Sequence, residues 1–472
     1  MSDTDLRLTK VLVAQFLQKH GYTKTLATFL KDSGVSMSSV NEKEFEELES
    51  IISDRIGFNH EAISEKLKSI SLNGELDSEN VARFKIPCWN HQLAWTPVES
   101  SSDLDTLVIK TRFLGHGLLA SATVDKKLIV SDFDHDNVTS DLVKQPGIIK
   151  YFGPISKEMF YTCTIDGKVH IRSQVNSASN RSWSFNLPVR AVMAMEMVLL
   201  DNKKILLFYC SLNNAINAYI YDMELEKLTM LSEYKLLSVC TALQLAFSED
   251  GCPVLFLSRQ DFTQIMMFRF EDSTITHIAN IALNTAQFST HSFNIADMLI
   301  VSFDPTWHPM NPHILQMNST TVLAVATTHT PYMRLITTKI PDLDKSSAVG
   351  ALHYESANSS QPNILDNYAK GNASKPVSVS NATKTYYDTI LQNIATVVPQ
   401  DSYSRPILKV SYLLGGLIIG ADDGLYAVDL QKSDTWRLDF GHEDRIKSMD
   451  FYKDDVSVSY ASTKLRLWKL EQ

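Results

Sequence analysis

The chain has 472 residues, of which 44% are apolar, and a net charge of −10 from 54 acidic and 44 basic residues. This apolar content is enough for one large core or two ordinary ones and predicts a folded, globular protein. The acidic balance, without a run of lysines or arginines, argues against nucleic acid as a direct ligand. Five scattered cysteines without a C-x-x-C spacing argue against a disulfide framework or a structural zinc site and favour a reducing compartment.

The opening residues, MSDTDLRLTK, lack the basic and apolar regions of a secretory signal. No later window reaches the roughly 18 consecutive apolar residues that a membrane span needs. We therefore expect an intracellular, cytoplasmic protein without a membrane span, with the nucleus as the alternative location.

From residue 5 to about 72, apolar residues recur at intervals of three and four, which predicts four short helices. Gly21, Gly34 and Gly57 interrupt this pattern where helices should end, and Thr23 stands where an N-cap acceptor is wanted. We expect a first helical segment at 1–38 and a helical extension at 39–72.

A polar linker is predicted at 73–87, because the composition there breaks the helical period. From residue 88 to 472, short runs of β-branched and aromatic residues alternate with turn residues and predict strands. These strands repeat about every 40 to 50 residues, a period typical of a β-propeller of about seven blades, within a range of six to eight. We place the blades near 88–140, 145–185, 187–233, 237–278, 293–341, 386–438 and 440–471. Residues 342–385, rich in Ser, Asn, Ala and Lys, are expected to be a mobile insertion between blades.

The last predicted unit, GHEDRIKSMDFYKDDVSVSYASTKLRLWKL, resembles a WD repeat. In that family, the His of Gly-His, a hydroxyl residue, a turn Asp and the Trp form a buried hydrogen-bonded set. Most other units keep only the turn residue, so the propeller resembles a divergent member of the WD class. The residues that match the structural positions of this family are Gly441, His442, Trp468, Asp125, Asp166 and Asp423.

The stretch LTKVLVAQFLQKHGYTKTLATFLKDSG resembles a LisH motif with its spacing kept throughout. The matching positions are Leu12, Val13, Phe16, Leu17, Gly21, Tyr22, Thr25, Leu26 and Phe29, with Leu26 in place of the usual Ala. The resemblance implies homodimerisation through these residues. Two short helices cannot bury an apolar face alone, whereas two copies packed as a four-helix unit can. The alternative is that the helices pack on the propeller of their own chain and leave a monomer.

Residues 42–72 occupy the place where a second helical module, called CTLH, follows many LisH motifs. The segment is too short for a whole module, and only an Ile-Ile helix, Gly57 and a second amphipathic helix agree with its pattern.

Motifs that would carry catalysis are missing from the sequence, and the best metal candidates, His308 and His313, are separated by prolines and read as surface residues. We predict no catalytic, cofactor-binding or metal-binding residues and no cofactor. A competing hypothesis is an enzyme that uses the channel of the propeller, but the blade-start residues Asn90, Thr164 and Ser258 show no catalytic set.

These features predict a non-catalytic homodimeric scaffold or adaptor whose propeller binds other proteins. The LisH and WD combination implies one of several assemblies. The CTLH-like pattern favours a ubiquitin-ligase-associated subunit, and the alternative is a structural or regulatory subunit of a transport or corepressor assembly. Fold alone does not decide between these assemblies.

Overall fold

The computed structural model describes most of the chain. The described residues are 3–40, 76–98, 106–115, 117–132, 139–156, 159–173, 181–189, 191–201, 203–284, 293–304, 314–341, 384–438, 444–453 and 455–471. The chain divides into two compact units, Met1–Asn73 and Gly74–Gln472. Each unit is considered by itself.

The first unit contains a helical hairpin, with α1 (Asp3–Lys19), α2 (Thr23–Ser33) and the single turn α3 (Met37–Val40). Gly21 and Gly34 have φ of 73° and 70°, so both glycines occupy the left-handed region that favours a residue without a Cβ atom. The predicted helix ends are confirmed at these two positions. The prediction for Thr23 is wrong, because Tyr22 is the N-cap of α2 and its side chain makes no capping hydrogen bond. The helices predicted within 41–72, including the CTLH-like pattern, lie outside the described residues.

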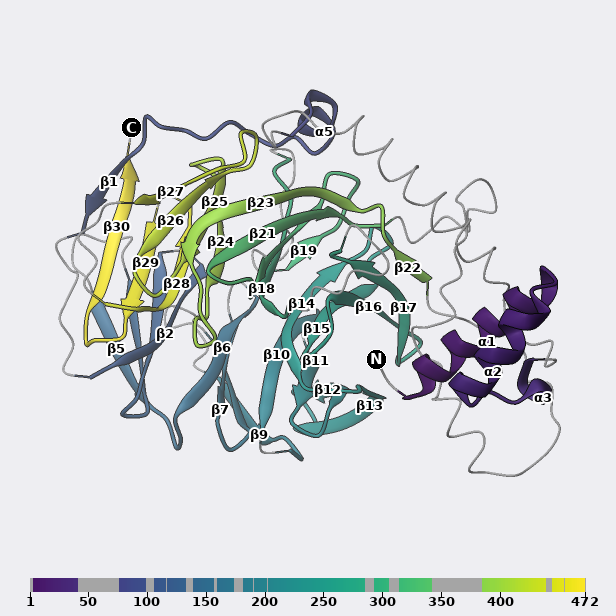
Figure 1. The fold of residues 1–472 in the computed structure, drawn as a ribbon. Helices are drawn as coiled ribbons and strands as arrows, with labels where there is room; N and C mark the ends of the chain where they lie inside the picture. The colour runs from purple at the N-terminus through teal and green to yellow at the C-terminus, as the bar shows by residue number, and fades with distance from the viewer. Residues whose placement is uncertain are drawn as a thin grey trace. The chain divides into compact units, whose positions relative to one another are not determined.

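The second unit is a β-propeller of seven sheets in the described part of the chain, which we number as blades in ring order (Figure 1). Blade 1 consists of β2 (Val108–Gly115), β3 (Leu118–Thr123), β4 (Lys127–Asp132) and β5 (Thr139–Lys144). Blade 2 consists of β6 (Ile149–Ser156), β7 (Met159–Thr164), β8 (Lys168–Ser173) and β9 (Ser182–Asn186). Blade 3 consists of β10 (Val192–Asp201), β11 (Lys204–Ser211), β12 (Ala215–Asp222) and β13 (Lys227–Lys235).

Blade 4 is the widest, with six strands. Its own strands are β14 (Cys240–Phe247), β15 (Pro253–Arg259), β16 (Gln264–Glu271) and β17 (Thr274–Ala282), and β19 (Leu315–Gln316) and β22 (Lys384–Tyr386) pair in parallel with β14 and β17. Blade 5 consists of β18 (Ile295–Val301), β20 (Val322–Thr327), β21 (Tyr332–Lys339) and β23 (Ile390–Pro399). Blade 6 consists of β24 (Ile407–Ser411), β25 (Gly416–Gly420), β26 (Leu425–Asp429) and β27 (Asp434–Leu438). Blade 7 consists of β28 (Ile446–Tyr452), β29 (Asp455–Tyr460), β30 (Leu465–Glu471) and β1 (Ala94–Pro97).

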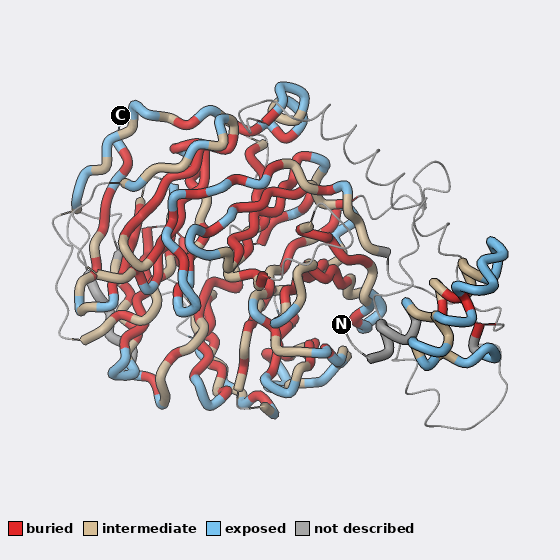
Figure 2. Tube along the Cα trace, viewed as in Figure 1, coloured by how far each residue is buried: buried red, intermediate tan, exposed pale blue. Residues whose placement is uncertain are grey.

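The core of the propeller lies between neighbouring blades. The middle strands are buried on both faces, as in β25, where all five residues are buried, so they form continuous apolar runs instead of alternating ones. Leu335 of blade 5 and Ile419 of blade 6 belong to one apolar cluster, and similar clusters join other pairs of blades. Figure 2 shows the strands mostly as buried and the turns mostly as exposed.

The ring closes by pairing the first strand of the unit with the last. β1 runs antiparallel to β30, from Ala94 opposite Glu471 to Pro97 opposite Trp468 (Figure 1). The sequence analysis placed this strand in the first blade, and the structure places it in the last. This pairing joins the two ends of the unit within one sheet and so closes the ring.

The insertion expected at 342–385 lies inside a blade and not between two blades. β21 pairs with β23, from Tyr332 opposite Pro399 to Thr338 opposite Ile390, so the insertion separates the third and fourth strands of blade 5. The sequence analysis assigned β23 to the next blade because the long insertion interrupts the strand rhythm. Most of the insertion lies outside the described residues, so its predicted mobility stays a prediction.

Residues 76–97 form an N-terminal strap across blades 5, 6 and 7, and not the free linker that was predicted for part of this range. Asp77 caps α5 (Ser78–Arg83) by accepting a hydrogen bond from the backbone N–H of Asn80 at 2.7 Å. Phe84 belongs to the apolar cluster of blades 5 and 6, and Trp89 packs edge-to-face on Trp436 with ring centroids 4.9 Å apart. The strap then continues into β1 and therefore belongs to the propeller.

Candidate functional site

The LisH hairpin has a small core of its own. Ala14 of α1, Leu26 of α2 and Val40 of α3 are buried against one another. Two side-chain hydrogen bonds hold the same faces together: Lys10 Nζ donates to the carbonyl of Ser33 at 3.2 Å and Gln15 Nε2 to that of Val40 at 3.0 Å. The face of α1 that carries Ala14 is thereby packed against α2 and α3 of the same chain.

The predicted dimerisation residues fall into three groups by burial on this hairpin. Leu26 is buried within the chain. Half-buried residues are Leu12, Val13, Phe16, Leu17 and Phe29, and exposed residues are Gly21, Tyr22 and Thr25. Leu12, Val13 and Phe16 lie on the side of α1 away from Ala14, because residues in a helix advance by about 100° each. The hairpin therefore carries a second apolar face that its own described helices do not cover.

An aromatic row extends this second face beyond the helix end. The rings of Phe16 and His20 lie 4.6 Å apart between centroids, and those of His20 and Tyr22 lie 6.4 Å apart. Tyr22 is 54% exposed. Large aromatic side chains of this kind commonly supply the anchor residues of protein interfaces.

The WD-like turn residues Asp125 and Asp166 have equivalent places in blades 1 and 2. Each accepts a hydrogen bond from the Thr two residues earlier, and that hydroxyl also contacts the backbone at Lys127 or Lys168. Hydrogen bonds from Lys127 and Thr123 hold the pKa of Asp125 below its ordinary value. The two aspartates thus fix the turn between the second and third strands, which is a structural role.

The remaining WD-like residues have different environments. Asp423 lies in the equivalent turn of blade 6, but Ala421 replaces the hydroxyl residue, and Asp423 instead accepts a hydrogen bond from Tyr426 at 2.7 Å. Trp468 is buried and meets Trp95 of β1 edge-to-face, with centroids 6.5 Å apart, so it helps to close the ring. Gly441 and His442 lie outside the described residues, as do His308 and His313.

The turns between second and third strands share one face of the propeller with the loops that connect successive blades. We call this the upper face. In blades 1 to 5 and blade 7, the backbone N–H of one turn residue donates to the carbonyl of a residue just before the inner strand. The donors are Val124, Ile165, Leu212, Gln260, Thr328 and Ala461. These six residues are therefore structurally equivalent positions on one face.

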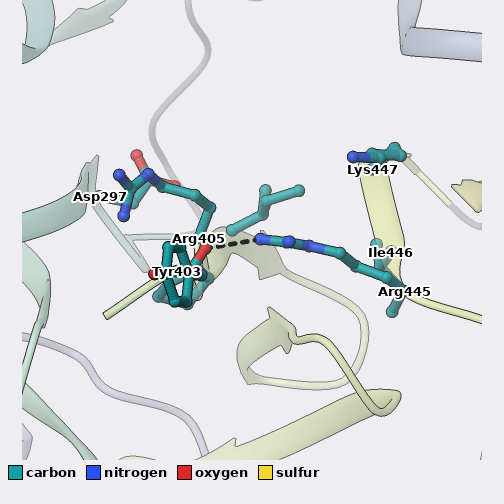
Figure 3. Close-up of a pocket in the computed structure, with 8 residues that line it drawn as sticks. Asp297, Tyr403, Arg405, Arg445, Ile446 and Lys447 are labelled. Atoms are coloured by element: carbon teal, nitrogen blue, oxygen red, sulfur yellow. Dashed lines mark hydrogen bonds between the residues drawn. The ribbon is translucent and has the colours of Figure 1, made fainter. Parts of the chain in front are cut away.

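A cavity of about 490 Å³ opens on the upper face where blades 5, 6 and 7 meet (Figure 3). We call it the mouth. Its lining residues are Asp297, Tyr403, Arg405, Pro406, Ile407, Arg445, Ile446 and Lys447. Figure 3 shows Arg445 reaching towards Tyr403, whose carbonyl accepts a hydrogen bond from Nη2 at 2.9 Å. Arg445 Nε also pairs with Asp422 at 2.6 Å, whereas Arg405 and Lys447 are exposed.

Charged groups on the inner strands join the blades below the mouth. Asp450 of blade 7 accepts a hydrogen bond from the backbone N–H of Phe113 in blade 1 at 2.8 Å and pairs with Lys409 of blade 6 at 2.7 Å. Asp297 of blade 5 accepts from the backbone N–H of Leu408 in blade 6 at 2.8 Å. These bonds fix the positions of the inner strands relative to one another around the channel.

Burial changes the ionisation of these channel groups. It raises the pKa of Asp297 to about 6, although the N–H groups of Leu408 and Met298 oppose the change. It also lowers the pKa of Lys110 to about 8, with help from the neighbouring Arg112 and Lys409. For Asp450, burial acts in the raising direction, but Lys409 and Arg112 outweigh it and leave the pKa below its ordinary value.

The side chains of the mouth are suited to binding a ligand. The mouth combines guanidinium and ammonium donors, which bind carboxylates well, with an exposed phenol. Within the described residues, no group of three or more His, Cys, Asp or Glu side chains could hold a metal ion. None of the described helices is long and apolar enough to cross a membrane.

The cysteines do not form part of the site. Cys163, Cys210 and Cys240 are buried, and burial raises the pKa of Cys163 to about 12, so its thiol stays protonated.

The residues of the mouth carry no motif that marks them as a site in the sequence. Arg405, Arg445 and Lys447 lie in two separate loops and become neighbours only when blades 6 and 7 pack together. A usable signal was present in the loops before the sixth and seventh inner strands, which carry SYSRPI and EDRIKS. With the correct blade boundaries, both basic loops stand at the same position, directly before the inner strand of their blades.

Comparison with known proteins supports both units. A family model described as the LisH domain of UCP007778 matches residues 7–41, and one described as its beta-propeller domain matches residues 70–469. An uncharacterized protein of Saccharomyces cerevisiae, YGR117C, is 30% identical over 489 residues, which cover 97% of this chain and 95% of that protein. The predicted combination of a LisH motif and a β-propeller is confirmed.

Proposed function

The chain belongs to the UCP007778 family, which joins a LisH domain to a β-propeller, and we propose that it is a non-catalytic, homodimeric scaffold. In this proposal, the hairpins of two chains pair, and each propeller binds a partner protein. Both domains are typical protein-interaction modules.

One observation carries the dimer part of the proposal, namely the second apolar face of α1. Leu12, Val13 and Phe16 remain half-buried while the opposite face of the same helix is fully packed. Short helices with so small a core are marginal by themselves in water. Pairing with the same face of a second copy buries this surface in a symmetric four-helix unit.

The propeller part of the proposal rests on its closed ring and its inter-blade bonds. A rigid frame of this kind can present loops whose sequence varies without loss of the fold. Two propellers in one dimer make the second contact with a partner assembly effectively intramolecular, which strengthens weak contacts.

The experiment is to measure the mass of the full chain in solution by light scattering, for the natural protein and for Phe16→Glu with Tyr22→Glu. We expect the natural protein at twice the chain mass and the double variant at one chain mass, with an unchanged β-rich circular dichroism spectrum. The matched control is Thr28→Glu with Ser38→Glu, which adds the same charge at exposed polar positions of the hairpin and should stay dimeric.

An unchanged mass of the Phe16 and Tyr22 variant would reject dimerisation through this face. A natural protein that is already monomeric at micromolar concentration would reject the homodimer itself. That result would favour the alternative, in which the helices pack on the propeller of their own chain.

A finer hypothesis is that the chain is a subunit of a ubiquitin-ligase assembly. Its support is the LisH resemblance together with the CTLH-like sequence pattern at 42–72. The test is to identify, by mass spectrometry, the proteins that co-purify with the full chain and with the Phe16 and Tyr22 variant. Ligase subunits that are recovered with the natural chain and weakened in the variant support this role. Recovery of transport or corepressor subunits instead would favour the alternative assembly.

We also propose a cytoplasmic location, for which the sequence is the support. Fluorescence microscopy of the tagged chain tests it, and accumulation in the nucleus would contradict it.

A further inference from the structure

Large apolar side chains are exposed at equivalent positions on three consecutive blades. Val124, Ile165 and Leu212 are 42%, 53% and 55% exposed, and each donates the same backbone hydrogen bond to the residue that precedes its inner strand. The equivalent positions of blades 4, 5 and 7 hold Gln260, Thr328 and Ala461. Among these six equivalent positions, large apolar residues therefore occur on blades 1, 2 and 3.

A fourth apolar residue continues this row towards blade 4. Leu237, in the loop between blades 3 and 4, is 81% exposed. The backbone N–H of the preceding Leu236 donates to the carbonyl of Asn214 at 2.7 Å, and Asn214 lies in the same turn as Leu212. Val124, Ile165, Leu212 and Leu237 thus lie at successive positions around the upper face, and we call these four residues the apolar arc.

The arc and the mouth are neighbours. The mouth takes Arg445 and Lys447 from the start of blade 7, and the arc begins on blade 1. Ser448 of blade 7 and Thr111 of blade 1 hold these two blades together, because Ser448 Oγ accepts from the Thr111 N–H and donates to its carbonyl, both at 3.1 Å. One binding surface can therefore extend from the mouth around blades 1, 2 and 3.

The charge of this surface indicates the partner. At the mouth, Arg405 and Lys447 are exposed cations, and Arg445 pairs with Asp422. Asp297 in the lining and Asp401 beside Tyr403 are further carboxylates there, so the positive excess is found around the arc. Around the arc, the turns and adjoining strand ends of blades 1 and 2 carry more lysines than aspartates. The lysines are Lys126, Lys127, Lys144 and Lys168, and the aspartates are Asp125 and Asp166. The excess is positive although the whole chain has a net charge of −10.

We propose that the upper face binds an acidic, extended segment of a partner protein, with its apolar side chains on the arc and its carboxylates at the lysines around the arc and at the exposed Arg405 and Lys447 of the mouth. The proposal rests on the proposed scaffold function and specifies the surface and the chemistry of its ligand. Exposed apolar side chains on rigid turns supply contact area at little entropic cost, and complementary charge speeds association and fixes orientation.

The test uses a random library of 12-residue peptides displayed on phage and panned against the full chain. We expect the enriched peptides to be acidic and to contain at least two large apolar residues. The tightest peptide is then made synthetically with a fluorescent label, and its Kd is measured by polarisation at low and high salt. We expect binding to weaken as salt rises, because ions screen the contacts at the mouth.

Two double variants test the two parts of the surface. Ile165→Glu with Leu212→Glu should raise the Kd of the peptide by about 30-fold or more. Arg405→Glu with Lys447→Glu should raise it by about tenfold. The matched controls lie on the opposite face: Leu225→Glu, at a residue 73% exposed in the turn between β12 and β13, and Lys204→Glu at the start of β11. Both controls should change the Kd by less than about twofold.

Three results would overturn the proposal. These are no enrichment of any peptide, enrichment of basic peptides, and peptides that lose affinity through Leu225→Glu but not through the arc variant. The last result would leave the scaffold function standing and move its binding surface to the opposite face. The mass and co-purification experiments test the scaffold function separately.

Discussion

The LisH hairpin and the propeller differ in how much of their apolar surface is buried within one chain. In the hairpin, only Val11, Ala14, Leu26 and Val40 are buried among the described residues, and one side of α1 keeps a half-buried apolar face. In the propeller, each described middle strand is packed between neighbouring blades, and β1 closes the ring on β30. Among the described residues, the hairpin thus buries few apolar side chains, whereas the propeller buries many.

This difference shows where association and where binding are expected. A surface that is incomplete because its core is too small favours a second copy of itself. A complete ring has no such need, so exposed apolar residues on its turns, such as Ile165 and Leu212, indicate contact with a different molecule.

The largest effect on stability is expected from truncating the chain beyond the boundary between the two units. Removing residues 1–73 should leave the propeller folded, because the strap that begins at Leu76 remains. Removing residues 1–97 also deletes Phe84, Trp89 and β1, and we expect it to lower the melting temperature by about 10 °C or more, or to abolish soluble expression. Thermal unfolding followed by circular dichroism compares the two truncations. Equal melting temperatures would mean that the strap contributes little to ring closure.

A pair of glycine substitutions tests how tightly the strap packs on blade 6. A methyl group at Gly416 would lie 2.6 Å from the ring of Trp89 and would overlap the carbonyl of Val428, so Gly416→Ala should cost about 3 kcal/mol or more. A methyl group at Gly153 would lie 2.5 Å from Arg112 Nη1, the end of a flexible side chain that can move. Gly153→Ala should therefore cost less than about 1 kcal/mol. Chemical denaturation measures both, and a larger loss at Gly153 would contradict this packing.

A smaller effect is expected from the half-buried carboxylate of Asp297 at the mouth. Burial raises the pKa of Asp297 from its ordinary value of 3.8 to about 6, so the folded state binds its proton more tightly than the unfolded state does. The contribution of Asp297 to stability should therefore fall as pH rises from about 4 to 6, with Lys409 and Lys110 as the nearby cations that limit the loss.

Asp297→Asn removes this titration. Relative to the variant, the natural chain should lose about 1 to 3 kcal/mol of unfolding free energy between pH 4 and pH 7. The measurement is urea denaturation of both proteins across this range. Parallel stability curves would show that Asp297 does not titrate between these limits.

Much of the fold could be predicted from the sequence because its signals are local. The left-handed glycines at 21 and 34, the LisH spacing and the turn aspartates at 125 and 166 each depend on a few neighbouring residues. The blade boundaries could not be predicted in the same way. β1 pairs with a strand more than 300 residues away, and β23 follows a long insertion, so neither leaves a local trace of its partner.

The candidate binding surface shows the same limit. The apolar arc consists of one residue from each of several turns, and Val124 or Leu212 reads alone as an ordinary strand residue. Equivalence of these positions becomes visible only through the shared backbone hydrogen bond. The mouth likewise needs the packing of blades 6 and 7 before its basic side chains meet.

The most direct test of the division between the two units is the solution mass of the full chain beside that of residues 74–472, at the same micromolar concentration. We predict a dimer for the full chain and a monomer for the truncated chain, because the proposed dimer is held by the apolar face of the hairpin. Two monomers, or two dimers, would contradict the claim that the hairpin holds two chains together while the propeller is left to bind a partner.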